Sequence, residues 1–231
     1  MRLGIHGRED EEGFLIFADR AEAGRRLAER LLQFREARPV VLALPRGGVP
    51  VAYEIARTLG APLDLVLVRK IGAPWQPELA LGAVSDGDVP RVALNQELIT
   101  AMGIDQEFLD AEVAAQFTEV KRQVAIYRRG RPPVPVNGRT VIVVDDGIAT
   151  GATVRAGIAA IRQDNPARII LAVPVAAIDS LELLRPDVDD IICLQSPPNF
   201  SAVGRFYVNF DQTTNEQVIA ALDAAASNIT T

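Results

Sequence analysis

Residues 141–153 read VIVVDDGIATGAT, and this stretch decides the fold that the sequence predicts. The β-branched run at 141–144 predicts a buried strand. Two carboxylates, Asp145 and Asp146, stand at its carboxyl end, and a glycine-bounded loop then leads into a helix. Because open α/β sheets bind ligands beyond the carboxyl ends of their strands, we expect the acid pair and the loop to form a binding site.

The loop 147–153 has the features of a phosphate site. Its backbone N–H groups and the following helix N-terminus favour an anion, and Thr150 and Thr153 add hydroxyl donors. Gly147 and Gly151 allow close approach of the backbone or a positive φ. The adjacent carboxylates would repel a bare phosphate, but each can accept a hydrogen bond from a sugar hydroxyl. The stretch therefore predicts a sugar-phosphate site; the structural alternative is a strand-turn-helix corner capped by threonines.

Two other phosphate motifs do not fit this loop. A P-loop ends in Gly-Lys-Ser/Thr, and the loop contains no Lys. A dinucleotide fingerprint reads G-x-G-x-x-G, whereas residues 147–152 read GIATGA. Four apolar residues, two acids and a loop ending Thr-Gly-x-Thr are instead similar to the phosphoribosyl pyrophosphate signature of type I phosphoribosyltransferases.

That resemblance assigns roles to the whole stretch. It implies that Asp145 and Asp146 bind the ribose hydroxyls and contact Mg²⁺ only indirectly, through substrate or water. Hypoxanthine/guanine-type enzymes carry an Asp where this sequence has Ala149, so the resemblance does not extend to their acceptors. The implied binding site for the 5′-phosphate consists of Gly147, Ile148, Ala149, Thr150, Gly151, Ala152 and Thr153.

Strands alternate with helices along the rest of the chain. Apolar runs predict strands at 39–44, 63–68, 91–94, 139–146, 167–173 and 190–194. Helical spacing predicts helices at 21–32, 49–59, 104–129, 151–162 and 214–226. The first of these helices opens with a capping-box variant, Asp19 and Glu22. This alternation predicts an α/β fold with a mainly parallel twisted sheet flanked by helices, in a single domain over 1–231.

A second loop, PRGG at 45–48, follows the first predicted strand. By itself a Gly-Gly turn after a strand is commonplace. Type I enzymes have a pyrophosphate loop at this place, which often carries a non-proline cis peptide. The resemblance therefore implies that Arg46, Gly47 and Gly48 bind pyrophosphate.

Arg69 and Lys70 end the next predicted strand and either face solvent or, as in related enzymes, contact pyrophosphate. The segment 71–90 is rich in Gly and Pro and is expected to be irregular or hairpin-like, at the place of the family's mobile catalytic loop. The resemblance gives catalytic roles to Arg46 and Lys70, as positive charge at the leaving group. Glu78, the acid in the Pro-rich part of this loop, is the expected proton acceptor.

Four longer strings resemble bacterial proteins described as phosphoribosyltransferases with no assigned acceptor. They are FADRAEAGRRLAERL, LALPRGGVPVAYEIA, VRKIGAPWQPELALGAV and PPNFSAVGRFYVNF. In such proteins a small hood above the strand ends selects the acceptor. We expect the hood to come from residues 1–18, from 196–210, or from both; these are called the hood segments below.

Composition excludes several classes of protein. The net charge of −6 disfavours a nucleic-acid partner. One Cys, Cys193, and one His, His6, are too few for a Cys/His zinc site or an internal disulfide, and a Ser-His-Asp triad would have to use His6. Cys193 lies in an apolar run and is expected to be a small buried hydrophobe. Without a signal peptide or a membrane-length apolar run, the expectation is a cytoplasmic protein with no membrane partner.

The sequence thus predicts an enzyme that transfers the 5-phosphoribosyl group from phosphoribosyl pyrophosphate, with Mg²⁺, to a small nitrogenous acceptor and releases pyrophosphate. One alternative is a non-catalytic regulator of the same fold that binds the sugar phosphate or a nucleotide. Another is a phosphatase-like hydrolase that uses Asp145 as nucleophile. The sequence leaves the acceptor open, and a homodimer is possible.

Overall fold

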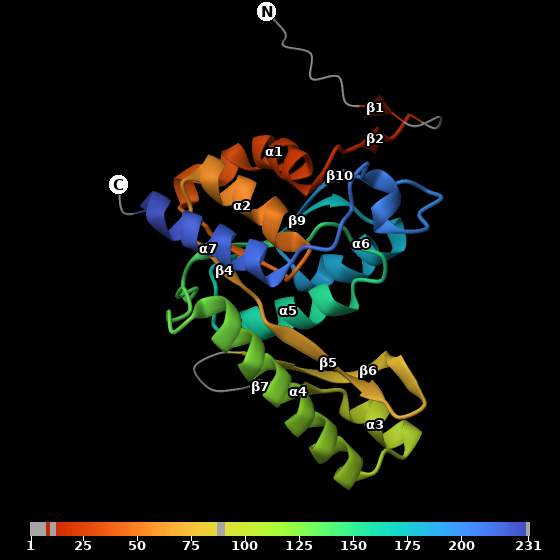
Figure 1. The fold of residues 1–231 in the computed structure, drawn as a ribbon. Helices are drawn as coiled ribbons and strands as arrows, with labels where there is room; N and C mark the ends of the chain where they lie inside the picture. Colours follow the sequence, from red (N-terminus) through yellow and green to blue (C-terminus); the bar gives the residue numbers. More distant parts are fainter. Residues whose placement is uncertain (1–7, 10–12, 87–90, 230–231) are drawn as a thin grey trace, which may run out of the picture.

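A five-stranded parallel sheet forms the centre of the molecule (Figure 1). The computed structural model describes residues 8–9, 13–86 and 91–229. All neighbouring strands of this sheet are parallel, so their carboxyl ends lie along one edge. The order is β10 (Asp190–Gln195), β9 (Arg168–Val175), β8 (Thr140–Val144), β3 (Val40–Ala43) and β4 (Leu63–Leu65).

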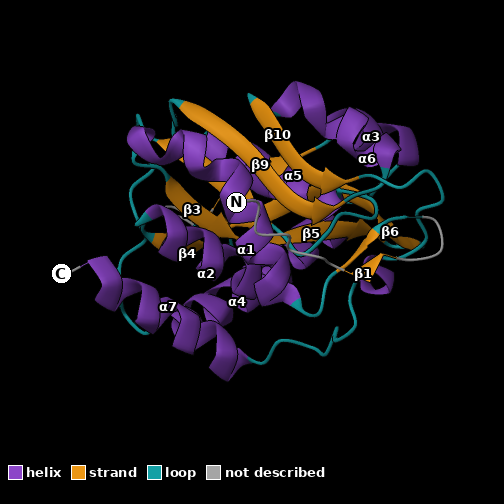
Figure 2. Ribbon diagram, turned by 90° about the horizontal axis from the view of Figure 1, so that it is seen from above, coloured by secondary structure: helices purple, strands orange, loops and turns teal. Residues whose placement is uncertain are grey.

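Helices cover both faces of this sheet (Figure 2). On one face Val41 and Ile142 belong to the core that includes residues of α1 (Arg20–Leu31), α2 (Gly48–Leu59) and α7 (Asn215–Ile229). On the other face Val40 and Val141 pack with residues of α5 (Ala152–Arg162) and α6 (Ile178–Leu184). Because both faces are buried, the strands are continuous apolar runs, which confirms the predicted parallel α/β fold.

A second, antiparallel sheet lies beside the first and forms the lower part of Figure 1 with two further helices. Its strands pair in the order β5-β6-β7, and α4 packs against β5 and β6. The described part of segment 71–90 is therefore a hairpin, one of the two expected forms, and its movement stays a prediction. The elements are β5 (Val68–Ala73), β6 (Gln76–Ser85), β7 (Arg91–Leu94), α3 (Gln96–Met102) and α4 (Gln106–Arg128).

One predicted element is divided in the structure: the strand expected at 63–68 ends at Leu65, and Val68 already belongs to the second sheet. The helix expected at 104–129 is present as α4, from Gln106 to Arg128, and a short helix that was not predicted, α3, precedes it. Gly103 ends α3 with a φ of 61°, a left-handed conformation that favours glycine, so the chain turns there before α4 begins.

The described part of segment 1–18 and segment 196–210 pack together next to the carboxyl edge of the parallel sheet. Phe17, Phe206 and Tyr207 are buried in one cluster. The N–H of Phe17 donates to the carbonyl of Phe206 at 2.9 Å, and the N–H of Val208 donates to the carbonyl of Phe17 at 2.8 Å. The short elements of the chain are β1 (Arg8–Glu9), β2 (Leu15–Ile16), η1 (Leu32–Ala37), η2 (Arg185–Asp187) and η3 (Val203–Phe206).

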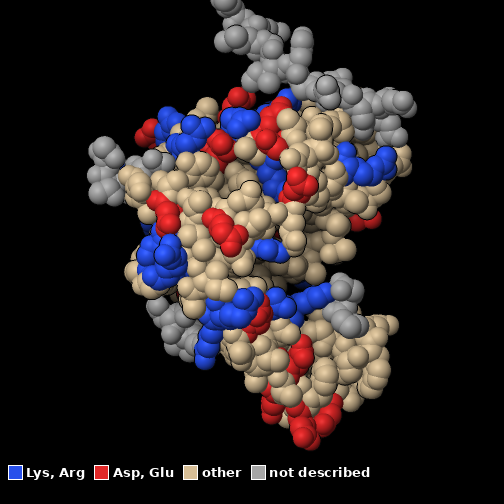
Figure 3. All heavy atoms as spheres, in the orientation of Figure 1, with Lys and Arg blue, Asp and Glu red and all other residues tan. Residues whose placement is uncertain are grey.

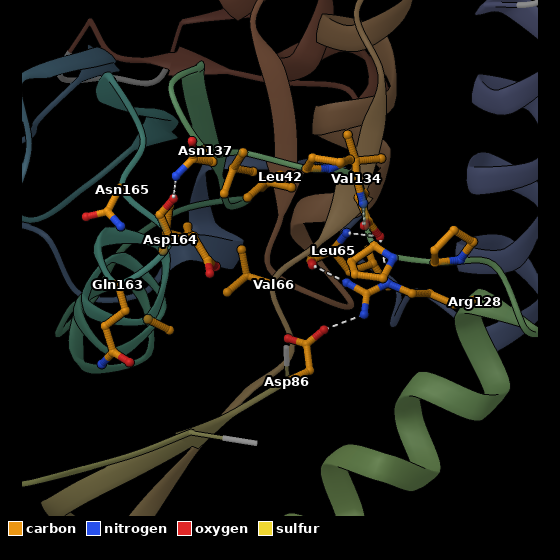
Figure 4. Close-up of a pocket in the computed structure, with 17 residues that line it drawn as sticks. Leu42, Leu65, Val66, Asp86, Arg128, Val134, Asn137, Gln163, Asp164 and Asn165 are labelled. Carbon is orange, nitrogen blue, oxygen red and sulfur yellow. Dashed lines mark hydrogen bonds and ion pairs between the residues drawn. The ribbon is translucent and has the colours of Figure 1, made fainter. Parts of the chain in front are cut away.

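A buried ion-pair network joins the two sheets (Figure 4). Arg128, the last residue of α4, bonds Asp64 of β4 at 3.0 Å and also pairs with Asp86, which follows β6. Its third nitrogen donates to the carbonyl of Leu65 at 3.1 Å. The side chains of Arg128, Asp64 and Asp86 are 7%, 8% and 12% exposed, so the three charges depend on one another for compensation.

In the described part of the chain, no helix has both the length and the apolar character needed to cross a membrane.

Candidate functional site

The acid pair directly follows β8, as the sequence predicts. Asp145 and Asp146 are both partly exposed. Asp145 Oδ1 accepts a hydrogen bond from the N–H of Asp146 at 2.9 Å. Asp146 is held from the hood side: Arg20 Nε donates to its Oδ2 at 2.7 Å, and the Tyr207 hydroxyl donates to its carbonyl oxygen at 2.6 Å.

Burial raises the pKa of both acids. The pKa of Asp145 lies well above its ordinary value because burial disfavours the charge and Asp146 adds repulsion. Burial also raises the pKa of Asp146, although its hydrogen bond with Arg20 opposes this shift. An acid pair that is partly desolvated in this way is typical of a ligand-binding site rather than of a solvated surface.

Replacing Asp145 with Asn should stabilise the fold at neutral pH. Because the pKa of folded Asp145 is raised, the folded carboxyl binds its proton more tightly than the unfolded one, whose pKa is about 3.9. Stability therefore falls as pH rises from there through the folded pKa. Asn avoids this loss at every pH and can still accept the bond from the Asp146 N–H. Thermal unfolding in metal-free buffer should show a Tm gain of about 2–4 °C per unit of pKa shift at pH 7.5.

The gain for Asp145→Asn should shrink as pH falls toward 4 and below, because the unfolded carboxyl then also takes up its proton. A gain that stays constant with pH, or a lower Tm at pH 7.5, would contradict a raised pKa at Asp145.

The PRGG loop packs its backbone against the acid pair. A Cβ atom on Gly47 would lie 2.1 Å from Asp146 Oδ2, and one on Gly48 would lie 2.6 Å from the carbonyl oxygen of Val144. Only glycine fits at these two positions, because any side chain would overlap the acid or the end of β8. The peptide bond between Pro45 and Arg46 is cis, the form that the resemblance leads us to expect.

The loop after the acids is fixed at its base and open at its tip. Two backbone hydrogen bonds of Ile148 tie it to the end of β9 and to the residue before α6. Ser180 Oγ donates to the carbonyl of Ala149 at 2.6 Å. Gly151, with a φ of 73°, is the N-cap of α5 and no side chain caps it. Thr150 and the first turn of α5 are largely exposed, and an uncapped helix N-terminus of this kind favours an anion.

A cavity of about 400 Å³ lies next to this loop, and we call it the Lys70 groove. Figure 3 shows Lys and Arg side chains gathered where the lower part of the molecule meets the main body. Arg69 Nε donates to Gln116 Oε1 of α4 at 2.6 Å. The groove thus lies between the start of α5 and two cations, Arg69 and Lys70. Its lining includes Pro45, Thr153, Arg69, Lys70, Glu112 and Gln116.

The remaining predicted residues lie elsewhere or outside the described part. The Arg46 side chain is within electrostatic range of Tyr127 and of Glu216, which lies at the start of α7. Arg46 does not line the described walls of the Lys70 groove. Glu78 belongs to β6, but its side chain lies outside the described residues, as does all of His6. Cys193 is partly buried, and burial raises the pKa of its thiol.

A second cavity, of about 440 Å³, lies away from these residues (Figure 4). Its walls include the connectors that lead into β8 and β9, so it lies toward the amino ends of these strands. None of the residues that we predict to bind substrate lines its described walls. Its buried charges, Arg128, Asp64 and Asp86, are paired with one another, which is the arrangement of a structural network.

Sequence reasoning missed the two residues that hold Asp146: Arg20 at the start of α1 and Tyr207 of the hood segment 196–210. Arg20 and Asp146 are 126 positions apart, and no periodicity or spacing links residues at such a distance. The strings that contain Arg20 and Tyr207 resemble those of other bacterial proteins, and that resemblance was the available signal.

The capping box at Asp19 and Glu22 is confirmed: the Glu22 N–H donates to Asp19 Oδ1 at 2.8 Å and the Ala18 N–H to Glu22 Oε2 at 2.6 Å.

Known proteins share this fold and this site region. A family model described as phosphoribosyl transferase domain matches residues 16–211. Mycobacterium tuberculosis strains CDC 1551 and H37Rv each have a "Putative phosphoribosyl transferase" that is 45% identical over 210 residues, covering 91% of this chain and 47% of that protein. The "Bifunctional protein PyrR" of Chloroflexus aurantiacus is 34% identical over 131 residues, covering 55% of this chain and 65% of that protein.

A solved structure matches over most of both chains. TT1426 from Thermus thermophilus is 44% identical, with a TM-score of 0.82, and the match covers 90% of this chain and 98% of that one. The chain spans about half the length of the Mycobacterium tuberculosis relatives. The family match nevertheless includes the acid pair, both loops and the hood segment 196–210. The chain therefore belongs to the type I phosphoribosyltransferase family.

Proposed function

We propose that this protein transfers the 5-phosphoribosyl group from phosphoribosyl pyrophosphate to a small nitrogenous acceptor and releases pyrophosphate. One observation carries the proposal: an acid pair, a glycine-rich backbone loop, an uncapped helix N-terminus and a cationic groove meet at the carboxyl edge of the parallel sheet. Membership of the family supports the same reaction class.

The donor would lie across this edge in one orientation. Asp145 and Asp146 accept hydrogen bonds from the ribose hydroxyls, and the amides from Gly147 to Thr153 surround the 5′-phosphate. The backbone of Gly47 and Gly48 packs closely against the acids. A pyrophosphate group bound between the acids and the Lys70 groove would therefore contact this backbone. Lys70 and Arg69 supply positive charge for the pyrophosphate.

The residues of the site suit Mg²⁺ held mainly by the donor. Within the described residues, no group of three or more His, Cys, Asp or Glu side chains could hold a metal ion. Carboxylate oxygens beside bound phosphates match the coordination that Mg²⁺ prefers, with waters in the other positions. Asp145 and Asp146 would contact the ion indirectly, and when bound it would supply positive charge at the leaving pyrophosphate.

The protein's part in the reaction is positioning and charge stabilisation. As the bond from C1 to pyrophosphate breaks, negative charge grows on the leaving group beside Lys70 and positive charge grows on the ribose beside the acids. The hairpin β5–β6 would close over the reacting atoms and exclude water, which would otherwise hydrolyse the activated sugar. Glu78 is the proposed proton acceptor, and the hood segments would select the acceptor.

A turnover assay tests this proposal. Full-length protein with phosphoribosyl pyrophosphate and Mg²⁺ should release pyrophosphate in the presence of one member of a panel of purines, pyrimidines and other nitrogen heterocycles. Calorimetry on the same sample should detect donor binding without any acceptor. Donor binding without turnover on any acceptor would favour the non-catalytic regulator, whereas the absence of donor binding would refute both functions.

A further inference from the structure

Arg20 is held by three contacts, which come from Asp146 and from the adjacent residues Phe210 and Asp211. Its Nε donates to Asp146 Oδ2 at 2.7 Å, and its Nη1 donates to the carbonyl of Asp211 at 2.7 Å. Its guanidinium carbon lies 3.9 Å from the centre of the Phe210 ring. The side chain is only 11% exposed, although it begins a helix near the surface. Such a set of contacts fixes both the position and the plane of the guanidinium.

The start of α1 is itself fixed, so Arg20 reaches Asp146 from a rigid base. Asp19 and Glu22 form the reciprocal capping box, which ties the backbone on either side of Arg20. The neighbouring Tyr207 hydroxyl donates to the Asp146 carbonyl at 2.6 Å. The backbone and the side chain of Asp146 are therefore both held from the hood side.

The contact leaves part of Asp146 available to a ligand. Arg20 bonds Oδ2, and a carboxylate offers about four lone-pair sites over its two oxygens. A ribose hydroxyl can thus bond Asp146 while Arg20 stays in place. The positive charge of Arg20 also offsets one of the two adjacent carboxylates, which reduces their repulsion of a donor that carries phosphate groups.

We infer that Arg20 is a positioning residue for the part of the donor site that binds ribose. Arg20 connects the hood segment 196–210 to the acid pair. The inference rests on the proposed function, because it requires that Asp146 bind ribose. Arg20 acts through Asp146, 2.7 Å away, and it does not line the described walls of the Lys70 groove. Its loss should therefore affect ribose binding far more than pyrophosphate binding.

Calorimetric titrations of the full chain with ribose 5-phosphate and, separately, with inorganic pyrophosphate, both with Mg²⁺, test the inference. Arg20→Met keeps the length of the apolar stem and removes the guanidinium. It should weaken ribose 5-phosphate binding by about 10- to 100-fold, the effect of one lost charged hydrogen bond. Pyrophosphate binding should stay within about threefold of wild type.

Two further variants separate positioning from a general structural role. Arg20→Lys keeps the charge but cannot bond both partners in one plane, so it should recover only part of the lost ribose 5-phosphate affinity. Arg26→Met is the matched control: Arg26 lies on the same helix, is 13% exposed and pairs with Glu22 at 2.6 Å. It should leave both affinities within about threefold of wild type.

Equal losses for both ligands in Arg20→Met, or unchanged ribose 5-phosphate affinity, would overturn the inference while leaving the proposed function in place. If Arg20→Met does not fold, the inference fails when Arg20→Lys binds ribose 5-phosphate as tightly as wild type. Wild-type protein that binds neither probe would overturn the proposed function and this inference together.

Discussion

Replacing Asp145 and Asp146 together with Asn should abolish measurable binding of phosphoribosyl pyrophosphate while the fold survives. Each carboxylate that accepts a hydrogen bond from a ribose hydroxyl contributes about 1.5–3 kcal/mol. Asn keeps one neutral carbonyl acceptor but loses the negative charge, so the two changes together correspond to a reduction in affinity of up to roughly 100-fold to 10,000-fold. Asn has nearly the shape of Asp, so the packing of Gly47 against residue 146 is preserved. Calorimetry with Mg²⁺ measures the affinity, and circular dichroism verifies the fold.

The chain offers a matched control for this double variant. Asp189 and Asp190 are also adjacent acids, but they lie at the amino end of β10, where Asp189 pairs with Arg162 and Asp190 with Arg168. Asp189→Asn with Asp190→Asn should leave donor affinity within about twofold of wild type. Unchanged affinity after the change at 145 and 146 would refute the assignment of the ribose site, and with it the proposed function.

The acid pair and its loop could be predicted because their signal is local. A buried parallel strand is a continuous apolar run, and the residues that follow it lie at the carboxyl edge wherever the strand sits in the sheet. The run at 141–144 is fully buried in the structure, and the predicted phosphate loop leads directly into α5. The packing of the PRGG loop on the acids could be expected only from the family resemblance, because it depends on β3 lying next to β8.

The rest depends on contacts between distant parts of the chain. Arg20 meets Asp146 across 126 positions, so its role appears only when the hood segments are folded against the acids. The run at 63–68 is apolar except for Asp64 and gives no sign that the strand leaves the parallel sheet after Leu65. That change of direction is supported by the network of Arg128, Asp64 and Asp86, whose members come from three separate segments.

This network leads to the second large expected effect, in stability rather than in binding. Arg128→Met should lower the free energy of unfolding by about 3–5 kcal/mol, because it leaves two buried carboxylates without a counter-charge, although each still accepts a hydrogen bond from a backbone N–H. At roughly 2–4 °C per kcal/mol for a chain of this size, the Tm should fall by about 6–20 °C. Burial already raises the pKa of Asp86 with Arg128 present. Without the guanidinium that pKa rises further, so the loss should deepen as pH increases from the unfolded pKa of about 3.9 through the folded pKa.

Two comparisons isolate the cause of this loss. Arg122→Met, on the same helix, removes an exposed ion pair with Glu119 and should cost under about 1 kcal/mol. Adding Asp64→Asn and Asp86→Asn to Arg128→Met should recover part of the stability, because the uncompensated charges are then gone although their hydrogen bonds are only partly replaced. If Arg128→Met unfolds at the wild-type temperature, the junction between the sheets does not depend on these charges. Apolar packing between α4 and the antiparallel sheet would then hold the Lys70 groove in place.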